Sequence, residues 1–275
     1  MKKVVFFDID GTLVSRQNYI PESAKRAIKE LKKQDILPVI ATGRATVLLE
    51  EVRNELEIDS YIAMNGQYIV LEGEPIYTNP ISEDLLVRLM EQAAEDRKGI
   101  VLCGTEDIFS NSIISLVQRS SMLKVLKSIG KIVPNKIQMS LFSRLIRKPP
   151  KPEDYKGKDI CQVILEVRER EESVYRENFK ELHFARSNDY TVDVISSGVT
   201  KATGIEKMVK ELGVELENTY AFGDSLNDLE MIQYVGTGVS MGNGWDELKK
   251  VADMITEDVS EDGIEKGLKK LNLIP

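Results

Sequence analysis

Apolar and polar positions alternate in two different ways along the chain, and the difference separates its ends from its middle. Near the N-terminus, an apolar run over residues 4–7 is followed by a segment, 21–34, whose apolar residues recur at helical spacing. Further strands are predicted over 37–41 and 61–64, with an amphipathic helix between them. Strands that alternate with helices in this way are typical of a parallel sheet covered by helices.

The same alternation returns near the C-terminus. A parallel-sheet α/β domain built from both ends of the chain would explain why the pattern stops in the middle and resumes. The strands are predicted at 219–222, 238–241 and 253–256, and the helices at 202–212, at 226–234, from 245 and from 263.

Between the two ends, strands and helices follow one another without regular alternation, which indicates an α+β insert of about 110 residues with its own core. A hairpin at 67–78 leads into it, and the segment 148–158 is too rich in Pro and Lys for anything but a loop. We place the insert at residues 82–191 and the surrounding domain at 1–81 and 192–275. Inside it, strands are predicted at 100–103, 107–110, 159–167, 183–186 and 190–195, and helices at 83–96, 112–128 and 171–180.

Composition narrows the function classes. The chain has 275 residues, enough for about two domains. A net charge of −8 argues against a partner that is nucleic acid or a membrane surface, so any anionic substrate must be bound by local positive groups. Cys103 and Cys161 are too few and too far apart for a disulfide framework or a thiolate metal site. The apolar run before Asp8 is too short for a signal peptide, so we expect a cytoplasmic protein.

Acidic and hydroxyl side chains follow the predicted parallel strands, at the edge where ligands bind in open α/β sheets. Asp8 and Asp10 are two apart, so in a strand they would point to one side and need a cation beside them. A turn in which both merely accept backbone hydrogen bonds is the alternative, but the convergence of four strand ends favours a ligand site. Aspartates without His or Cys suit Mg²⁺ rather than zinc. The other residues at these ends are Thr42, Arg44, Asn65, Asp224 and Asp228.

Four segments together resemble, in order and spacing, the motifs of the haloacid dehalogenase superfamily: DIDGTL, the strand ending in ATGR, the lysine of SSGVTKATGIEKM, and GDSLND. The resemblance is closest to the superfamily's Cof-type phosphatases, in which a large cap is inserted between the second and third motifs. It implies a Rossmann-like parallel-sheet core with an inserted α+β cap, and Mg²⁺-dependent hydrolysis of small phosphorylated metabolites, sugar phosphates above all. Ala202 follows the motif lysine where the family often has Gly, which affects the helix entry only slightly.

The resemblance also implies a role for each site residue. Asp8 would be the nucleophile that forms an aspartyl-phosphate, and Asp10 the general acid and base. The phosphoryl group would be held by Thr42, Gly43, Lys201 and Asn227, and the metal by Asp8, the backbone carbonyl of Asp10, and Asp224. Supporting positions behind these are expected for Arg44, Asn65 and Asp228, the last as the partner of Lys201.

Two other functions stay open at this level. A phosphohexomutase-like phosphotransferase would need a bisphosphate activator and a second phosphate site in the insert. A non-catalytic sensor of phosphorylated ligands would not need both Asp8 and Asp10. The insert matches no motif that would name the substrate, and the sequence leaves the oligomeric state open. Trp245 is expected to pack its helix on the sheet.

Overall fold

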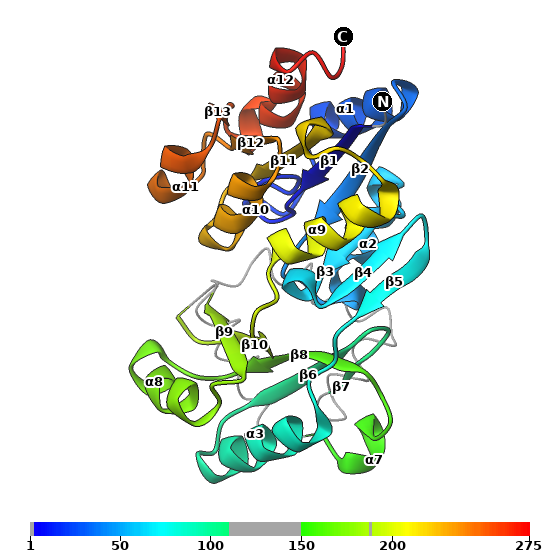
Figure 1. The fold of residues 1–275 in the computed structure, drawn as a ribbon. Coiled ribbons are helices and arrows are strands. Elements are labelled where there is room, and N and C mark those ends of the chain that lie inside the picture. The colour runs from blue at the N-terminus through cyan, green and yellow to red at the C-terminus, as the bar shows by residue number, and fades with distance from the viewer. Residues whose placement is uncertain (1–2, 110–149, 187–188) are drawn as a thin grey trace. The chain divides into compact units, whose positions relative to one another are not determined.

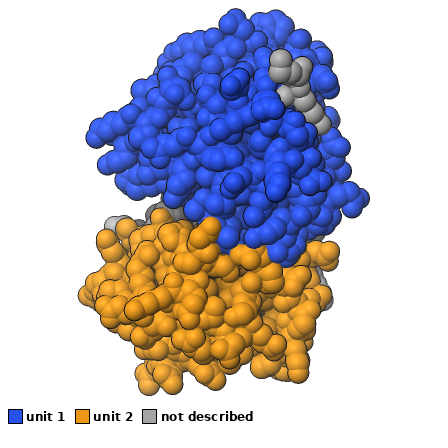
Figure 2. All heavy atoms as spheres, in the orientation of Figure 1, with its two compact units in different colours: residues 1–44, 48–78, 199–275 blue, residues 45–47, 79–198 orange. Residues whose placement is uncertain are grey.

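The computed structural model describes residues 3–109, 150–186 and 189–275 and divides the chain into two compact units (Figure 2). The first unit consists of residues 1–44, 48–78 and 199–275, and the second of residues 45–47 and 79–198. The helix predicted at 112–128 lies outside the described residues.

The first unit is built on an eight-stranded sheet with the order β13-β12-β11-β1-β2-β3-β4-β5 (Figure 1). The pairs from β13 to β3 are parallel, while β4 and β5 add an antiparallel hairpin. Because β1 lies between β11 and β2, the chain winds outward from β1 in both directions, and the carboxyl ends of the strands there form a ligand-binding edge. The strands are β1 (Lys3–Phe7), β2 (Ile36–Ala41), β3 (Tyr61–Ala63), β4 (Tyr68–Leu71), β5 (Glu74–Thr78), β11 (Thr219–Gly223), β12 (Thr237–Ser240) and β13 (Met254–Ile255).

Helices cover both faces of this sheet, as the sequence pattern predicts. Val4 and Phe6 of β1 pack with residues of α9 and α10 in one hydrophobic cluster. On the other face, Gly267 of α12 lies against the ring of Phe222, and α1 contacts both α12 and β2. The helices are α1 (Glu22–Lys33), α2 (Thr46–Leu56), α9 (Lys201–Leu212), α10 (Leu229–Tyr234), α11 (Asp246–Val251) and α12 (Gly263–Lys270), with short 3-10 turns η1 (Met64–Gly66), η2 (Leu216–Asn218), η3 (Leu226–Asp228) and η4 (Val259–Glu261).

The second unit holds a five-stranded antiparallel sheet with the order β7-β6-β8-β10-β9. Leu102, Val163 and Val194 from one face of this sheet pack with Leu89 of α3 and Tyr175 of α8 in a separate hydrophobic core. The strands are β6 (Ile100–Gly104), β7 (Ile108–Phe109), β8 (Ile160–Leu165), β9 (Leu182–Arg186) and β10 (Val192–Ser196), and the helices are α3 (Glu83–Glu95), α7 (Pro152–Tyr155) and α8 (Glu169–Asn178).

Three local features differ from the sequence prediction. The segment expected to be a loop contains α7, because Pro152 suits a first turn and the Asp154 carboxylate accepts a hydrogen bond from the backbone N–H of Lys151. Strand β10 belongs to the second unit, although the predicted boundary gave 192 onward to the first, because it pairs with β8 and β9. The helix predicted at 226–234 is divided into η3 and α10. No helix among the described residues is both long and apolar enough to cross a membrane.

Candidate active site

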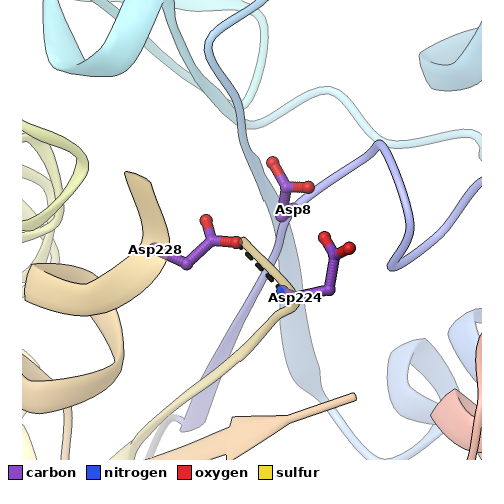
Figure 3. Close-up of side chains that lie close together, drawn as sticks. All are labelled: Asp8, Asp224 and Asp228. Atoms are coloured by element: carbon purple, nitrogen blue, oxygen red, sulfur yellow. Dashed lines mark hydrogen bonds between the residues drawn. The ribbon is translucent and has the colours of Figure 1, made fainter. Parts of the chain in front are cut away.

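Three carboxylates gather where β1 and β11 end. Asp8 follows β1 directly, Asp224 follows β11, and Asp228 lies at the end of η3. Each offers a carboxylate oxygen within 4.8 Å of the others (Figure 3). Asp8 and Asp228 are 5% and 0% exposed, so this negative charge is largely removed from water. Carboxylates so placed need a cation between them.

Lys201, the first residue of α9, supplies one such cation. Its Nζ donates hydrogen bonds of 2.6 Å to Oδ1 of Asp8 and 2.6 Å to Oδ1 of Asp228. Burial alone would lower the pKa of Lys201, but the charges of Asp228 and Asp8 raise it above its usual value, so the ammonium form is favoured. A cation at a helix N-terminus opposes the helix dipole, and these two carboxylates offset that cost.

Asp228 is fully engaged by hydrogen bonds. Its Oδ2 accepts from the backbone N–H groups of Asp224 and Ser225, each at 3.0 Å, while Oδ1 accepts from Lys201. These bonds explain why the helix predicted here begins with a separate tight turn. They also leave Asp8 and Asp224 as the carboxylates with oxygens available to a metal ion.

One lysine does not offset the negative charge of this cluster. Burial raises the pKa of Asp8 to about 8, an effect that Lys201 opposes and Asp228 reinforces. Burial and the charge of Asp228 likewise raise the pKa of Asp224 to about 7. A further cation would favour the ionised form of both groups. Because the atoms that these three residues offer to a metal are all carboxylate oxygens, the cluster fits Mg²⁺.

The loop after β1 comes close to Asp224. Gly11 has a φ of +87°, and a Cβ atom at this position would lie 2.2 Å from Oδ2 of Asp224. Any side chain there would therefore displace the carboxylate. The turn that sequence analysis expected after Asp10 therefore needs glycine at position 11, because the backbone there passes directly beside the Asp224 carboxylate.

Asp10 is not part of the buried cluster, because β1 ends at Phe7 and the Asp10 side chain is 64% exposed. Arg44, which follows β2, binds it with both arms of the guanidinium: Nε to Oδ2 at 2.8 Å and Nη2 to Oδ1 at 2.5 Å. Nη1 of Arg44 also donates to the backbone carbonyl of Leu48 in α2. Arg44 therefore fixes the orientation of the Asp10 carboxylate.

The remaining residues expected in the site lie at the ends of β2 and β3 or in η3. Thr42 Oγ1 accepts from the backbone N–H of Arg44 at 3.1 Å, and Gly43 lies against the amide of Asn65. Asn227 Nδ2 donates to Asn65 Oδ1 at 3.4 Å. Met64 and Asn65 both have positive φ values, of 51° and 54°, a conformation that costs about 1–3 kcal/mol per residue.

Two side chains that contact Asp224 were not expected from the sequence. Thr12 Oγ1 donates to Oδ1 of Asp224 at 3.5 Å, and Asn243 Nδ2 donates to Oδ2 at 3.4 Å. The signal that could have identified Asn243 is its place between two glycines directly after the strand at 238–241. The expectation for Trp245 is wrong: its side chain is 55% exposed, and only its backbone N–H reaches the site, at the carbonyl of Asp224.

Comparison with known proteins identifies the family of the chain. The sequence profile of the haloacid dehalogenase-like hydrolases matches residues 5–268. YkrA of Bacillus subtilis (strain 168), which carries a provisional phosphatase name, is 38% identical over 274 residues, which cover 99% of this chain and 98% of YkrA.

Two relatives whose names state a substrate are each 28% identical to this chain. The structure of BT4131, a sugar phosphatase of HAD subclass IIB, has a TM-score of 0.78 and 28% identity, and covers 99% of this chain and 100% of its own. The 5-amino-6-(5-phospho-D-ribitylamino)uracil phosphatase YcsE of Bacillus subtilis (strain 168) is 28% identical over 274 residues, 97% of this chain and 94% of YcsE. The chain therefore belongs to the haloacid dehalogenase-like hydrolases, in their Cof-type phosphatase branch.

Proposed function

We propose that the chain is a Mg²⁺-dependent phosphatase that hydrolyses small phosphorylated metabolites through an aspartyl-phosphate on Asp8. The placement of Asp8 carries this proposal. Lys201 binds Oδ1 of Asp8 at 2.6 Å, and no described residue donates a hydrogen bond to Oδ2. A carboxylate held by one oxygen presents the other in a fixed direction, as a nucleophile must be presented.

The reaction would proceed in two steps. First, an oxygen of Asp8 bonds to phosphorus while the bond from phosphorus to the leaving oxygen breaks, and Asp10 gives that oxygen a proton. Then a water oxygen bonds to phosphorus, Asp10 takes the water's proton, and the bond from Asp8 to phosphorus breaks to release inorganic phosphate. Lys201 would offset negative charge on the phosphoryl oxygens, with Thr42 and Asn227 as hydrogen-bond donors.

Asp8 and Asp224 would hold the Mg²⁺ ion, with the backbone carbonyl of Asp10 as the third ligand that the family resemblance implies. When bound, the ion supplies positive charge that reduces the repulsion between an anionic nucleophile and an anionic phosphate ester. The raised pKa values of Asp8 and Asp224 support this assignment, because burial and the neighbouring Asp228 disfavour the ionised form of both groups and a bound cation would favour it.

The substrate class follows from what the named relatives share. One acts on sugar phosphates and the other on a phosphorylated ribitylamino compound, so both leaving groups are polyhydroxylated carbon chains. We therefore infer a phosphate monoester of a polyhydroxylated metabolite as the substrate, with sugar phosphates as the first compounds to try.

Phosphate release from a panel of such monoesters tests the proposal directly. We expect steady release with Mg²⁺, loss of release in excess EDTA, and recovery when Mg²⁺ is added back. Full activity in excess chelator would contradict the metal assignment. Release that required a bisphosphate activator would indicate the phosphotransferase instead, and binding without any release would indicate a sensor.

We further assign the choice of substrate to the second unit, since the candidate catalytic residues all lie in the first. Val163 and Val194 face the core with α3 and α8, so Gln162 and Asp193, their neighbours in β8 and β10, lie on the opposite sheet face. Substitution of Gln162 or Asp193 should change the ranking of substrates by kcat/KM much more than it changes hydrolysis of p-nitrophenyl phosphate. Equal losses on both kinds of substrate would contradict this division of roles.

A further inference from the structure

The loop between β12 and α11, residues 241–245, encloses Asp224 through its backbone. The N–H of Met241 donates to the carbonyl of Gly223, and the N–H of Trp245 donates to the carbonyl of Asp224, each at 2.9 Å. Gly244 lies so close that a Cβ atom there would be 3.3 Å from the Cα of Asp224. The peptide that carries this carboxylate is therefore held by the same loop on both sides.

Asn243 is the side chain of this loop that reaches the Asp224 carboxylate. Its Nδ2 donates to the carbonyl of Gly11 at 2.8 Å and to Oδ2 of Asp224 at 3.4 Å. Its Oδ1 accepts from the backbone N–H of Val259 at 2.9 Å. Since only the amide oxygen can accept from Val259, the amide nitrogen must face Gly11 and Asp224. The side chain thus joins three segments that are far apart in the sequence, in one orientation.

We propose that Asn243 is a positioning residue that orients the Asp224 carboxylate for Mg²⁺. Thr12 donates to Oδ1 and Asn243 to Oδ2, at 3.5 and 3.4 Å, so each oxygen of this carboxylate has one protein donor. A donor on each side favours one orientation of the carboxylate, and because each oxygen has two lone-pair sites, one site on each oxygen stays available to a metal ion. The inference rests on the proposed function, and specifically on its metal site.

The contact to Gly11 extends this role to the nucleophile's loop. Gly11 is three residues after Asp8, and its carbonyl is bound by the same amide nitrogen that faces Asp224. Asn243 therefore couples the positions of the two carboxylates assigned to the metal, although it belongs to neither strand. Loss of such outer partners typically weakens metal binding about 10–100-fold.

Metal binding measured without substrate tests the inference. Mg²⁺ titrated calorimetrically into the full-length protein gives a Kd, and we expect Asn243→Ala to raise that Kd about 10–100-fold. At saturating Mg²⁺ the kcat of this variant should largely recover, which a general loss of structure would not allow. The matched control is Gln233→Ala, an exposed amide on α10, whose Kd should equal that of the wild type.

Asn243→Asp keeps the test decisive if Asn243→Ala does not fold. The aspartate retains an acceptor for the N–H of Val259 but has no donor for Gly11 or Asp224, so we again expect weaker Mg²⁺ binding. A Kd within about twofold of the wild-type value in a folded variant, or tighter binding by Asn243→Asp, would overturn the positioning role. A wild-type protein that bound no Mg²⁺ would instead overturn the metal site of the proposed function.

Discussion

Each of the two units buries a charged cluster, and the charges are balanced in opposite ways. In the second unit, the carboxylate of Glu172 is bound by Arg176 at 2.6 Å and by Arg186 at 2.7 Å, so two cations meet one anion. In the first unit, the ammonium group of Lys201 binds two carboxylates, Asp8 and Asp228, and the third carboxylate of the candidate site, Asp224, lies beside them.

The two clusters also differ in how well water reaches their charged groups. In the second unit the anion is bound by two arginines, and the Arg176 side chain is 46% exposed, so water solvates its charge. In the first unit the negative charge lies on carboxylates that are nearly or partly buried, where solvation is poor. A buried ion pair is therefore not evidence of function by itself. What marks the site in the first unit is buried charge that the protein's own groups do not offset.

The largest expected effect is that of Asp8→Asn. The amide keeps the shape of the side chain and can still accept a hydrogen bond from Lys201, but it has no charge with which to attack phosphorus. We expect kcat/KM for p-nitrophenyl phosphate to fall more than about a thousandfold. Because one of three clustered negative charges is removed, the Tm in EDTA should not decrease. Appreciable turnover, or a clear loss of Tm, would contradict the role given to this cluster.

Lys201→Met tests the same cluster from the cationic side. Methionine fills similar space but leaves Asp8 and Asp228 without the ammonium group that binds both of them. We expect kcat/KM to fall more than tenfold, and stability in EDTA to fall by about 3–5 kcal/mol, the usual cost of breaking a buried ion pair. Added Mg²⁺ should restore part of that stability. Urea denaturation in EDTA and in Mg²⁺ measures the loss of stability and its recovery. An unchanged stability in EDTA would show that the clustered negative charges do not destabilise the fold.

Glu172→Gln is the matched variant in the second unit. It removes the anion between Arg176 and Arg186, each of which also donates to a backbone carbonyl, of Phe184 and Val167 respectively. Because hydrogen bonds to charged groups are worth about 1.5–3 kcal/mol, we expect a stability loss of that size. Hydrolysis of p-nitrophenyl phosphate below the melting range should be unchanged. A loss of turnover like that of Asp8→Asn would remove the distinction between the two clusters.

Local sequence pattern was sufficient to predict the parallel sheet and the acidic strand ends. Periodicity is set by neighbouring residues, and strands that end in Asp8 or Asp224 place these side chains at one edge in any sheet of this topology. The pairing of Asp10 with Arg44 could not be predicted in this way, because it joins residues 34 apart whose side chains leave the sheet. The same holds for Asn243, whose partners lie on three separate segments.

The insert was harder to predict for a related reason. Strands of an antiparallel sheet take their places from their partners, so the pairing of β10 with β8 and β9 puts it wholly in the second unit, whereas the predicted boundary cut the strand expected at 190–195. A four-residue helix such as α7 depends on one proline and one side-chain cap, which a pattern of apolar spacing does not record. The cytoplasmic location stays a prediction.

The smallest expected effect concerns Asp193, a carboxylate of the second unit with no cation beside it among the described residues. Burial raises its pKa to about 7, against a hydrogen bond from Gln162 that favours the ionised form. In the unfolded chain an aspartate has a pKa near 3.9, so between about pH 4 and 7 the folded state binds the proton more tightly. The stability of the protein should therefore decrease as pH rises through that window and then level off.

Asp193→Asn should remove the part of this pH dependence that comes from Asp193, while the part that comes from the raised pKa values of Asp8 and Asp224 stays. We expect the variant and the wild type to melt together near pH 4, and the variant to melt higher at pH 8, by at least the ~2–4 °C that 1 kcal/mol produces in a protein of this size. The difference should not change with Mg²⁺, because a lone carboxylate can be neutralised by one proton whereas three clustered carboxylates need a divalent ion. Thermal melts at both pH values, with and without Mg²⁺, measure it. A Tm difference that disappeared in Mg²⁺ would mean that Asp193 also binds the ion. The second unit would then contain a metal site of its own, and buried carboxylates without a neighbouring cation would no longer distinguish the first unit from the second.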